Sequence, residues 1–196
     1  MNISQTETET IQLMSQYSIN GELTTATSNA DYLLKTRNLI DACVKYLANL
    51  FPIIKVLEIV QVPANNPTDF VTYALPIKFD HMISVHLKKY PRYETIPYLI
   101  QGSNMLINPS YDGTIILTYK KIPDDIIQTT AATTELELIA VCQKAIPYYV
   151  AGWTYIEDNP TIGTMLLNEF QNKVNAIKQF LPVTPTQIEN IYSGFL

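Results

Sequence analysis

Apolar positions along the chain follow a helical period, then a two-residue period, then a helical period again. From Ser28 onward the spacing is helical, and Ser28 followed by Asp31 has the form of a capping box. We therefore predict an amphipathic helix over 28–51, which Pro52 ends because proline removes a backbone donor. Its apolar stripe consists of Leu33, Leu34, Ile40, Val44, Leu47 and Phe51.

A second stripe widens the apolar face of this helix beyond the need of one core. It consists of Tyr32, Leu39, Cys43, Tyr46 and Leu50. Two interpretations stay open: the wide face is wholly internal to the monomer, or it also contacts another subunit. Under the second interpretation the candidate subunit-interface residues are Tyr32, Leu39, Tyr46 and Leu50.

The stretch 53–123 consists of short runs of strand-forming residues punctuated by prolines, which sheets tolerate mainly at strand ends and edges. Runs spaced this closely predict an antiparallel meander. Turn-forming residues over 102–104 and 108–113 separate the later runs. The predicted strands are 56–62, 70–75, 82–90, 98–101, 105–107 and 114–119.

The last of these runs has a clear alternation. Ile115, Leu117 and Tyr119 fall on one face, and the residues between them are mixed. We expect the apolar face to pack on a helix.

Helical spacing returns after a threonine-rich connection, where Thr134 is placed to cap a helix over 135–158. Pro147 lies in the middle of this helix and should kink it. A turn at 158–160 then leads into a second amphipathic helix. The two helices predict an antiparallel helical hairpin over 135–181.

The two ends of the chain break these patterns. Residues 1–27 are predicted to be a flexible N-terminal segment, because residues 1–10 are too polar to become ordered without a partner. Within this segment, residues 11–19 can form a short helix. Residues 182–196 are predicted to be an extended C-terminal arm, which either enters a groove of a partner or folds back over the chain's own helices. Its apolar partner-interface candidates are Ile188, Ile191, Tyr192, Phe195 and Leu196.

The whole pattern predicts an α+β fold that is mainly helical. An N-terminal amphipathic helix and a C-terminal antiparallel helical hairpin form the core over 28–181, with a short-stranded antiparallel β region inserted over 53–123 and the C-terminal arm extending from it. At 196 residues and 47% hydrophobic content the chain can build a sizeable core.

Charge and hydropathy exclude some classes of partner. A net charge of −5 disfavours nucleic-acid binding, which depends on clustered cations. The small basic cluster of Lys88, Lys89 and Arg92 is interpreted as a solvated strand edge. No apolar run approaches the roughly 20 residues that cross a bilayer, and the polar N-terminus does not have the form of a signal peptide. We expect a soluble intracellular product with no membrane partner.

Residues that could carry chemistry are few. Cys43 and Cys142 are far apart and have no metal-ligand spacing, so buried free thiols are expected. An enzyme would have to pair Asp124 or Asp125 with His81 or His86, and no nucleophile and base stand at an interpretable spacing. We predict no catalytic, cofactor-binding or metal site.

The order of elements resembles that of the head–tail connector proteins of tailed bacteriophages, the adaptor or head-completion family. The resemblance covers about residues 30–181 and lies in pattern rather than in an invariant motif. It rests on a helix ending Leu50-Phe51-Pro52, on strand segments 73–76 and 82–85, on a strand ending over 117–123 as LTYKKIP, on helix segments 135–138 and 147–152, on the turn 158–160, and on a final helix around 168–170.

The resemblance implies a structural virion protein, commonly a dodecameric ring, at the head–tail interface. Such a ring binds the portal protein above and tail components below, and DNA passes through its channel without specific binding. The arm 182–196 looks like an extension that grips the portal. The resemblance implies no catalytic residue and no cofactor, and a protein made in the bacterial host cytoplasm. A tail terminator or another neck or tail protein is the alternative, and a small enzyme is the third reading.

Overall fold

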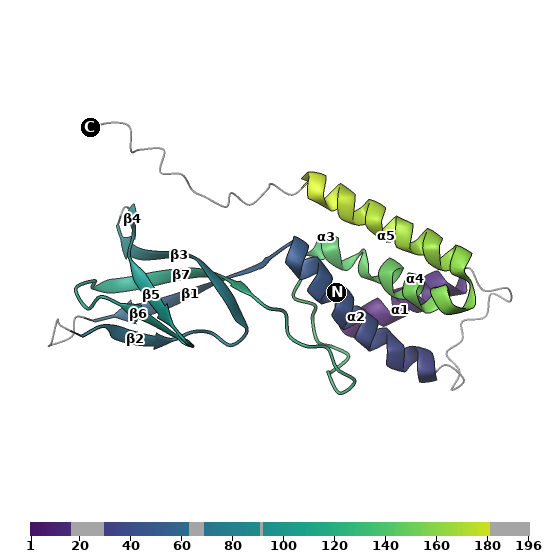
Figure 1. Cartoon of the computed structure of the whole chain (residues 1–196), viewed down its shortest axis with the longest axis horizontal. Coiled ribbons are helices and arrows are strands. Elements are labelled where there is room, and N and C mark those ends of the chain that lie inside the picture. Colours follow the sequence, from purple (N-terminus) through teal and green to yellow (C-terminus); the bar gives the residue numbers. More distant parts are fainter. Residues whose placement is uncertain (17–29, 63–68, 91, 181–196) are drawn as a thin grey trace. The chain divides into compact units, whose positions relative to one another are not determined.

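A computed structural model describes residues 1–16, 30–62, 69–90 and 92–180, and only the backbone of 30–34 (Figure 1). The chain divides into two compact units, Met1–Ile40 with Gln128–Leu196, and Asp41–Ile127. We call them the helical unit and the β unit. The predicted α+β class is confirmed, whereas the description as mainly helical is only partly met, since 43% of the chain is helix and 30% is strand.

The helix α2 (Ala30–Leu50) contributes residues to both units. It ends at Leu50, two residues before Pro52, as predicted. Ile40, Val44 and Leu47 of the predicted stripe are buried. The predicted cap at Ser28 lies outside the described residues.

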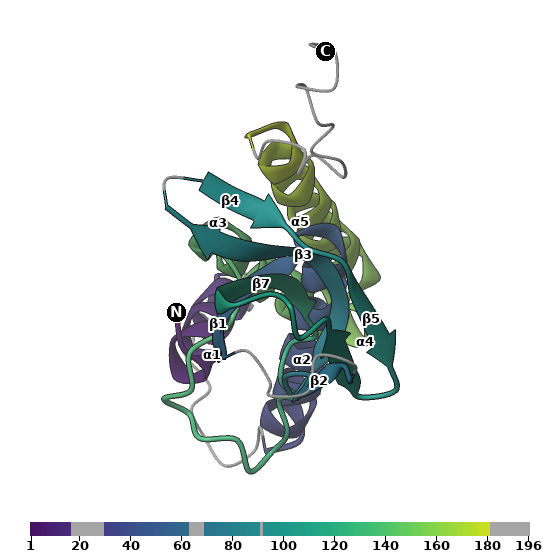
Figure 2. The ribbon, with the colours of Figure 1, turned by 90° about the vertical axis from the view of Figure 1, so that its left-hand side faces the viewer.

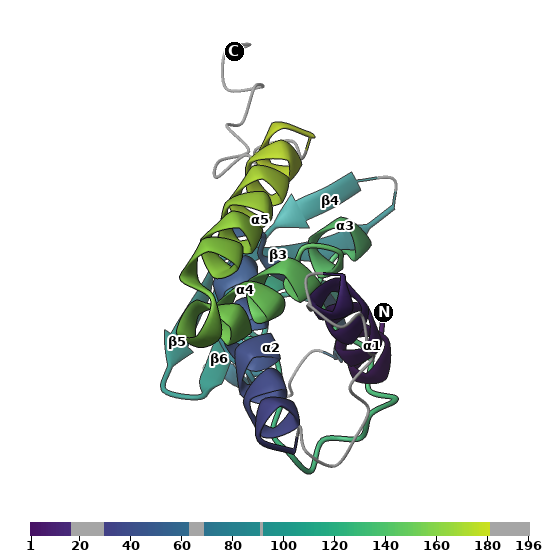
Figure 3. The ribbon, with the colours of Figure 1, turned by 90° about the vertical axis from the view of Figure 1, so that its right-hand side faces the viewer.

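The helical unit contains α1 (Ile3–Ser15), α3 (Ala140–Gln143), α4 (Ile146–Asp158) and α5 (Pro160–Phe180). α4 and α5 lie side by side and are joined at Asn159, which confirms the predicted hairpin over this part of the chain (Figure 1). α1 packs against α4 (Figure 3).

The helix α1 corrects the prediction of a flexible N-terminal segment over residues 1–16; the rest of the predicted segment, 17–27, lies outside the described residues. Asn2 caps α1, and the reciprocal hydrogen bonds between Asn2 and Gln5 form a capping box. Ile3, Thr6 and Thr10 are buried on one face. The two threonine hydroxyls donate to carbonyls four residues earlier, at 2.9 and 2.7 Å, so each buries a methyl group with its polar atom satisfied.

The chain start is also held by backbone hydrogen bonds to the connection before α3. Ile3 N donates to Thr134 O at 3.1 Å, and Ser4 N donates to Ala132 O at 2.9 Å. Leu136 N donates in turn to Met1 O at 3.1 Å. These bonds order the polar N-terminus without a partner molecule.

The predicted helix over 135–158 is broken. Residues 135–139 are not helical, because the Gln143 side chain donates to the carbonyls of Leu136 and Leu138 at 2.9 and 2.6 Å. Pro147 lies in the first turn of α4, where its missing N–H costs no helical hydrogen bond. The expected mid-helix kink is therefore wrong: the proline starts a new helix.

Two glycines set the separation of α4 and α5. A Cβ on Gly152 would lie 2.8 Å from Leu167 Cγ, and a Cβ on Gly163 would lie 2.8 Å from Ile156 N. Both distances are shorter than atoms allow. The hairpin is therefore packed with backbone against backbone at this point.

The β unit contains β1 (Ile53–Gln61), β2 (Val71–Ala74), β3 (Phe79–Lys89), β4 (Arg92–Thr95), β5 (Tyr98–Gln101), β6 (Asn104–Ile107) and β7 (Gly113–Lys121). Six of these match the predicted strands, and β4 was not predicted. They form two antiparallel sheets, in the orders β1-β7-β3-β4 and β2-β6-β5. Figure 2 shows β3 between β4 and β7.

This topology differs from a simple meander. β1 pairs along its whole length with β7, from Ile53 opposite Lys121 to Gln61 opposite Gly113. β5 and β6 form a predicted tight hairpin, in which Gly102 takes a φ of 59° at the first turn position.

The core of the β unit lies between the two sheets. Ile115 and Leu117 of β7 are buried, as their alternation predicted. They pack with Met105 and Ile107 of β6 rather than on a helix, which corrects that expectation. The full cluster is Val85, Leu87, Ile96, Met105, Ile107, Ile115 and Leu117.

If α1 is an integral part of the helical unit, Ile3→Ala should lower the free energy of unfolding by about 2–4 kcal/mol, because it leaves a cavity at a fully buried position. Urea denaturation followed by circular dichroism measures this. Thr8→Ala, on the exposed side of α1, is the matched control and should change stability by less than about 0.5 kcal/mol. Equal stabilities for the two variants would contradict the docking of α1.

Gly163→Ala tests the close contact of α4 and α5. Helix propensity alone favours alanine by about 1 kcal/mol, but the added methyl group meets the Ile156 backbone. We expect a net destabilisation of about 1–3 kcal/mol. Thr164→Ala, on an exposed neighbouring position, should not destabilise. A stabilised Gly163→Ala protein, measured by thermal unfolding, would refute the contact.

Candidate functional site

The predicted interface residues are only partly described. The C-terminal arm candidates Ile188, Ile191, Tyr192, Phe195 and Leu196 lie outside the described residues, as does the side chain of Tyr32. On α2, Leu39 and Leu50 are half-buried and Tyr46 is 38% exposed. Among the described side chains of this set, Tyr46 is the most exposed.

The enzyme alternative would pair Asp124 or Asp125 with His81 or His86. In the structure each of these four residues contacts a different side chain instead. His81 Nδ1 lies 3.3 Å from Asp80 Oδ2, and His86 Nδ1 lies 3.2 Å from Thr95 Oγ1. Asp124 accepts from Lys121 Nζ at 3.0 Å. Asp125 belongs to the ion-pair network described next.

A network of four charged side chains lies at the base of the β unit. Lys45 Nζ on α2 lies 2.7 Å from both Asp41 Oδ2 and Asp125 Oδ1. Lys78 Nζ contacts Asp125 Oδ2 at 2.5 Å. Asp41 Oδ1 accepts from Ile126 N at 2.9 Å, so the network joins α2 to the segment after β7 and to the turn before β3.

The network shifts the titration of its members. The hydrogen bond from Lys45, followed by that from Lys78, lowers the pKa of Asp125 to about 2. The same bond to Asp125, with that to Asp41, raises the pKa of Lys45. Lys78 has a φ of 62°, a left-handed conformation that costs a non-glycine residue energy, and its carbonyl accepts from Ile122 N at 2.7 Å. These ion pairs hold α2, the segment after β7 and the turn before β3 together, which is a structural role.

Buried polar groups in the described residues are also used structurally. Gln61 is buried, donates to Asn108 O and Tyr111 O at 2.9 and 2.6 Å, and accepts from the Tyr73 hydroxyl at 3.0 Å. No buried side-chain nitrogen or oxygen in the described ranges lacks a hydrogen-bond partner. Gln61 therefore fixes the 108–111 turn to β1 and β2.

The two cysteines are buried and free, as predicted. Burial raises the pKa of Cys142 to about 11, which keeps it a neutral thiol at pH 7. Across residues 1–16, 30–62, 69–90 and 92–180 no three metal-ligating side chains gather at one place. None of the helices in the described part is long and apolar enough to span a bilayer.

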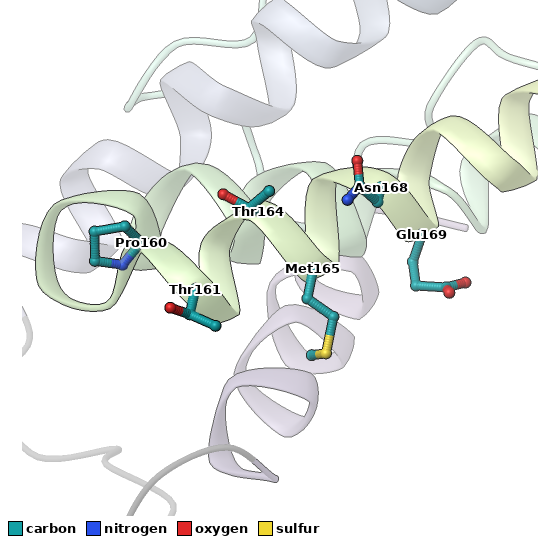
Figure 4. A pocket seen from close by; sticks show the side chains of 6 residues that line it. All are labelled: Pro160, Thr161, Thr164, Met165, Asn168 and Glu169. Carbon is teal, nitrogen blue, oxygen red and sulfur yellow. The ribbon is translucent and has the colours of Figure 1, made fainter.

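A shallow hollow lies along the N-terminal half of α5. Its lining comes from this single helix, and the side chains project from successive turns with one carboxylate among them (Figure 4). The lining residues are Pro160, Thr161, Thr164, Met165, Asn168 and Glu169. A surface built from one helix can bind an apolar or polar partner but does not surround a small molecule.

Exposed apolar side chains gather on the four-stranded sheet. On β1, Ile54, Val56 and Val60 are 43%, 62% and 71% exposed, and they follow one another on the same face of the strand. Tyr93 on β4 is also exposed. We call this side of the sheet, which faces away from the core cluster, the outer face. The sequence did not indicate this face, because residues 53–62 are β-branched on both sides of the strand.

We compared the chain with protein families and with curated proteins. No protein-family model matches the chain, and no curated protein matches it.

The pH dependence of stability tests the ion-pair network. The pKa of Asp125 is about 2 in the folded protein against an ordinary 3.8, so the unfolded state binds this proton more tightly. The stability it contributes is complete above about pH 5 and is lost progressively as the pH falls through the folded pKa toward about 1. Asp125→Asn should therefore be less stable than the parent at neutral pH, and the difference should shrink steadily between about pH 5 and about pH 2.

Urea denaturation at a series of pH values measures this difference. Asp112→Asn replaces an exposed carboxylate of the same unit and serves as the control, which should follow the parent at every pH. A difference for Asp125→Asn that stays constant from neutral pH down to pH 2 would show that the carboxylate charge is not what stabilises the unit.

Proposed function

We propose that the chain is a structural subunit of a tailed-phage neck, a head–tail connector that forms a ring between the portal and the tail. The observation that supports this most directly is the exposed outer face of the four-stranded sheet, with Val56 and Val60 at 62% and 71% exposure. Exposed apolar patches of this kind mark surfaces for protein contact. The resemblance in element order over 30–181 supplies the class of assembly.

Charged and polar groups support the same proposal. The ion pairs around Asp125 and the buried amide of Gln61 are engaged in holding the β unit together. Cys142, whose pKa burial raises, is a poor nucleophile at neutral pH. The described residues also expose large apolar side chains on β1, and apolar surface of this kind acts by binding.

A ring of identical subunits uses heterologous contacts, in which one flank of each copy matches the opposite flank of the next. Tyr46 on α2 and the outer face are exposed apolar surfaces that we propose for such contacts. A dodecamer is the assembly that the resemblance implies. The net charge of −5 suits a channel through which DNA slides without being gripped.

The C-terminal arm provides the proposed portal contact. Its five apolar residues follow two prolines that separate them from α5. A segment that becomes ordered only on its partner loses conformational entropy, which weakens its binding. We therefore propose that the arm binds the assembled portal, which offers a larger contact surface than a single subunit.

Replacing Ile188, Ile191, Tyr192, Phe195 and Leu196 with serine should weaken binding to portal rings at least about tenfold, because apolar anchors carry most of the energy of such contacts. Co-sedimentation with rings of the portal protein from the same phage measures it, and thermal unfolding should be unchanged.

The matched control changes five polar residues of the same arm, Thr184, Thr186, Gln187, Asn190 and Ser193, to alanine, and should bind as the parent does. Undiminished capture of the serine variant would remove the arm from the proposal. Capture by a tail tube instead of the portal would favour the tail-terminator alternative.

A further inference from the structure

The four-stranded sheet has two edges that can meet each other. In the order β1-β7-β3-β4, β1 pairs only with β7 and β4 pairs only with β3 among the described residues. Every pair is antiparallel. Because the number of strands is even, the two edge strands run in opposite directions. A β4 from another copy can therefore extend the sheet at β1 in the same antiparallel sense, without turning the sheet over.

The strand register assigns each side chain at these edges to a face. Ile116 of β7 lies opposite Glu58 on one side and His86 on the other, and His86 lies opposite Thr95. Opposed residues of an antiparallel sheet share a face. Since Ile115 and Leu117 point into the core, the row through Ile116 belongs to the outer face.

Alternation then places the remaining edge residues. On β1 the outer face carries Ile54, Val56 and Val60, and the core side carries Lys55. On β4 the outer face carries Tyr93 and Thr95, and the core side carries Arg92 and Glu94. β1 also carries Glu58 on its outer face and the partly buried Leu57 and Ile59 on its core side. The charges that the two edges offer each other on the core side are therefore Lys55 on β1, and Arg92 and Glu94 on β4.

One register matches the two edges best. With Lys55 opposite Glu94, Val56 lies opposite Tyr93, so an opposite-charge pair forms on one face and a β-branched–aromatic pair on the other. A shift by two residues in one direction places Lys55 opposite Arg92, which repels. A shift in the other direction removes Lys55 from the reach of β4 and sets Glu58 opposite Tyr93.

The preferred register also uses the rest of β1. Continued beyond β4, the same register sets the fully exposed Tyr90 opposite Ile59. Glu94 already accepts from Lys89 Nζ at 2.8 Å. A carboxylate has two oxygens and accepts several hydrogen bonds, so contact with Lys55 does not require that this bond break.

We infer that copies of this chain join by edge-to-edge strand pairing, β1 of one copy against β4 of the next, with Lys55 opposite Glu94 and Val56 opposite Tyr93. A second copy is the occupant because both complementary edges are on the same chain and have matching strand direction. The contact is heterologous, so it is repeated from copy to copy. Closure of this repeat into a ring rests on the proposed function; the pairing itself does not.

Cysteine cross-linking tests the pairing. A mixture of Val56→Cys and Tyr93→Cys proteins, oxidised with and without portal rings, should give a disulfide-linked dimer, because directly opposed residues bring their Cβ atoms within about 5.5 Å. Cys43 and Cys142 are buried and do not compete. The control mixture of Val60→Cys and Tyr93→Cys is out of register and should cross-link far less.

The alternative outcomes overturn the inference. A covalent dimer of Val56→Cys alone would show that two β1 edges meet symmetrically. Absence of the mixed dimer, both with and without portal rings, would show that these edges do not meet at all. Circular dichroism spectra that match the parent confirm that the variants are folded.

Charge reversal gives a second readout. Lys55→Glu and Glu94→Lys should each weaken self-association at least about tenfold, because each places like charges opposite one another. The double variant that carries both changes should regain self-association, because the charge pair is restored with its signs exchanged. If the two changes instead damage the fold, the double variant should associate more weakly than either single variant. Sedimentation velocity measures the association.

The failure of this inference is distinguishable from the failure of the proposed function. Portal co-sedimentation without the mixed cross-link would leave the connector proposal standing and discard the strand pairing. A mixed cross-link without any portal binding would do the reverse.

Discussion

The β unit depends on one long-range ladder, the pairing of β1 with β7. Each of the nine residues of β1 has a partner on β7, although the strands are separated by the whole of the rest of the unit. β7 is paired on its other side with β3, so its backbone groups are satisfied along both edges. Because Ile53 lies opposite Lys121, the chain begins and ends the unit at the same place. The β unit can therefore be an insertion in the sequence of the helical unit.

The ion-pair network reinforces that place. Lys45 lies on the chain segment that leads into β1, and Asp125 lies on the segment that leaves β7. Their salt bridge joins the two connections a few residues beyond the end of the ladder. The helical unit has a comparable constraint in the close approach of α4 and α5 at Gly152 and Gly163, where neither residue has room for a Cβ atom. In both units a few positions fix a geometry that the apolar pattern alone leaves free.

Local patterns in the sequence predicted six strands, the end of α2 and the hairpin of α4 and α5. Pairing between distant segments was not predictable from them, because alternation shows that β1 is a strand and does not show that β7 is its partner. β4 was missed since it is only four residues long, Arg92–Thr95, and has a single large apolar side chain, so it shows no apolar run. The helix α1 was missed because Thr6 and Thr10 count as polar, whereas their back-bonded hydroxyls let them serve as core residues.

The candidate interfaces show the same limit. The arm and the wide face of α2 were predicted from apolar composition, and Tyr46 is exposed as an interface residue requires. The outer face and the two sheet edges were not predicted, because they exist only once the strand order is known. Val56 and Val60 look like core residues in the sequence and are exposed in the structure. The matched edges give the proposed ring a specific contact.

The proposed connector function requires this chain to assemble with copies of itself around a channel. Electron micrographs of the purified full chain, alone and mixed with portal rings, show whether it does. We predict an annular particle about as wide as the portal and stacked on it in the mixture. Single, unassociated subunits in both samples would contradict it.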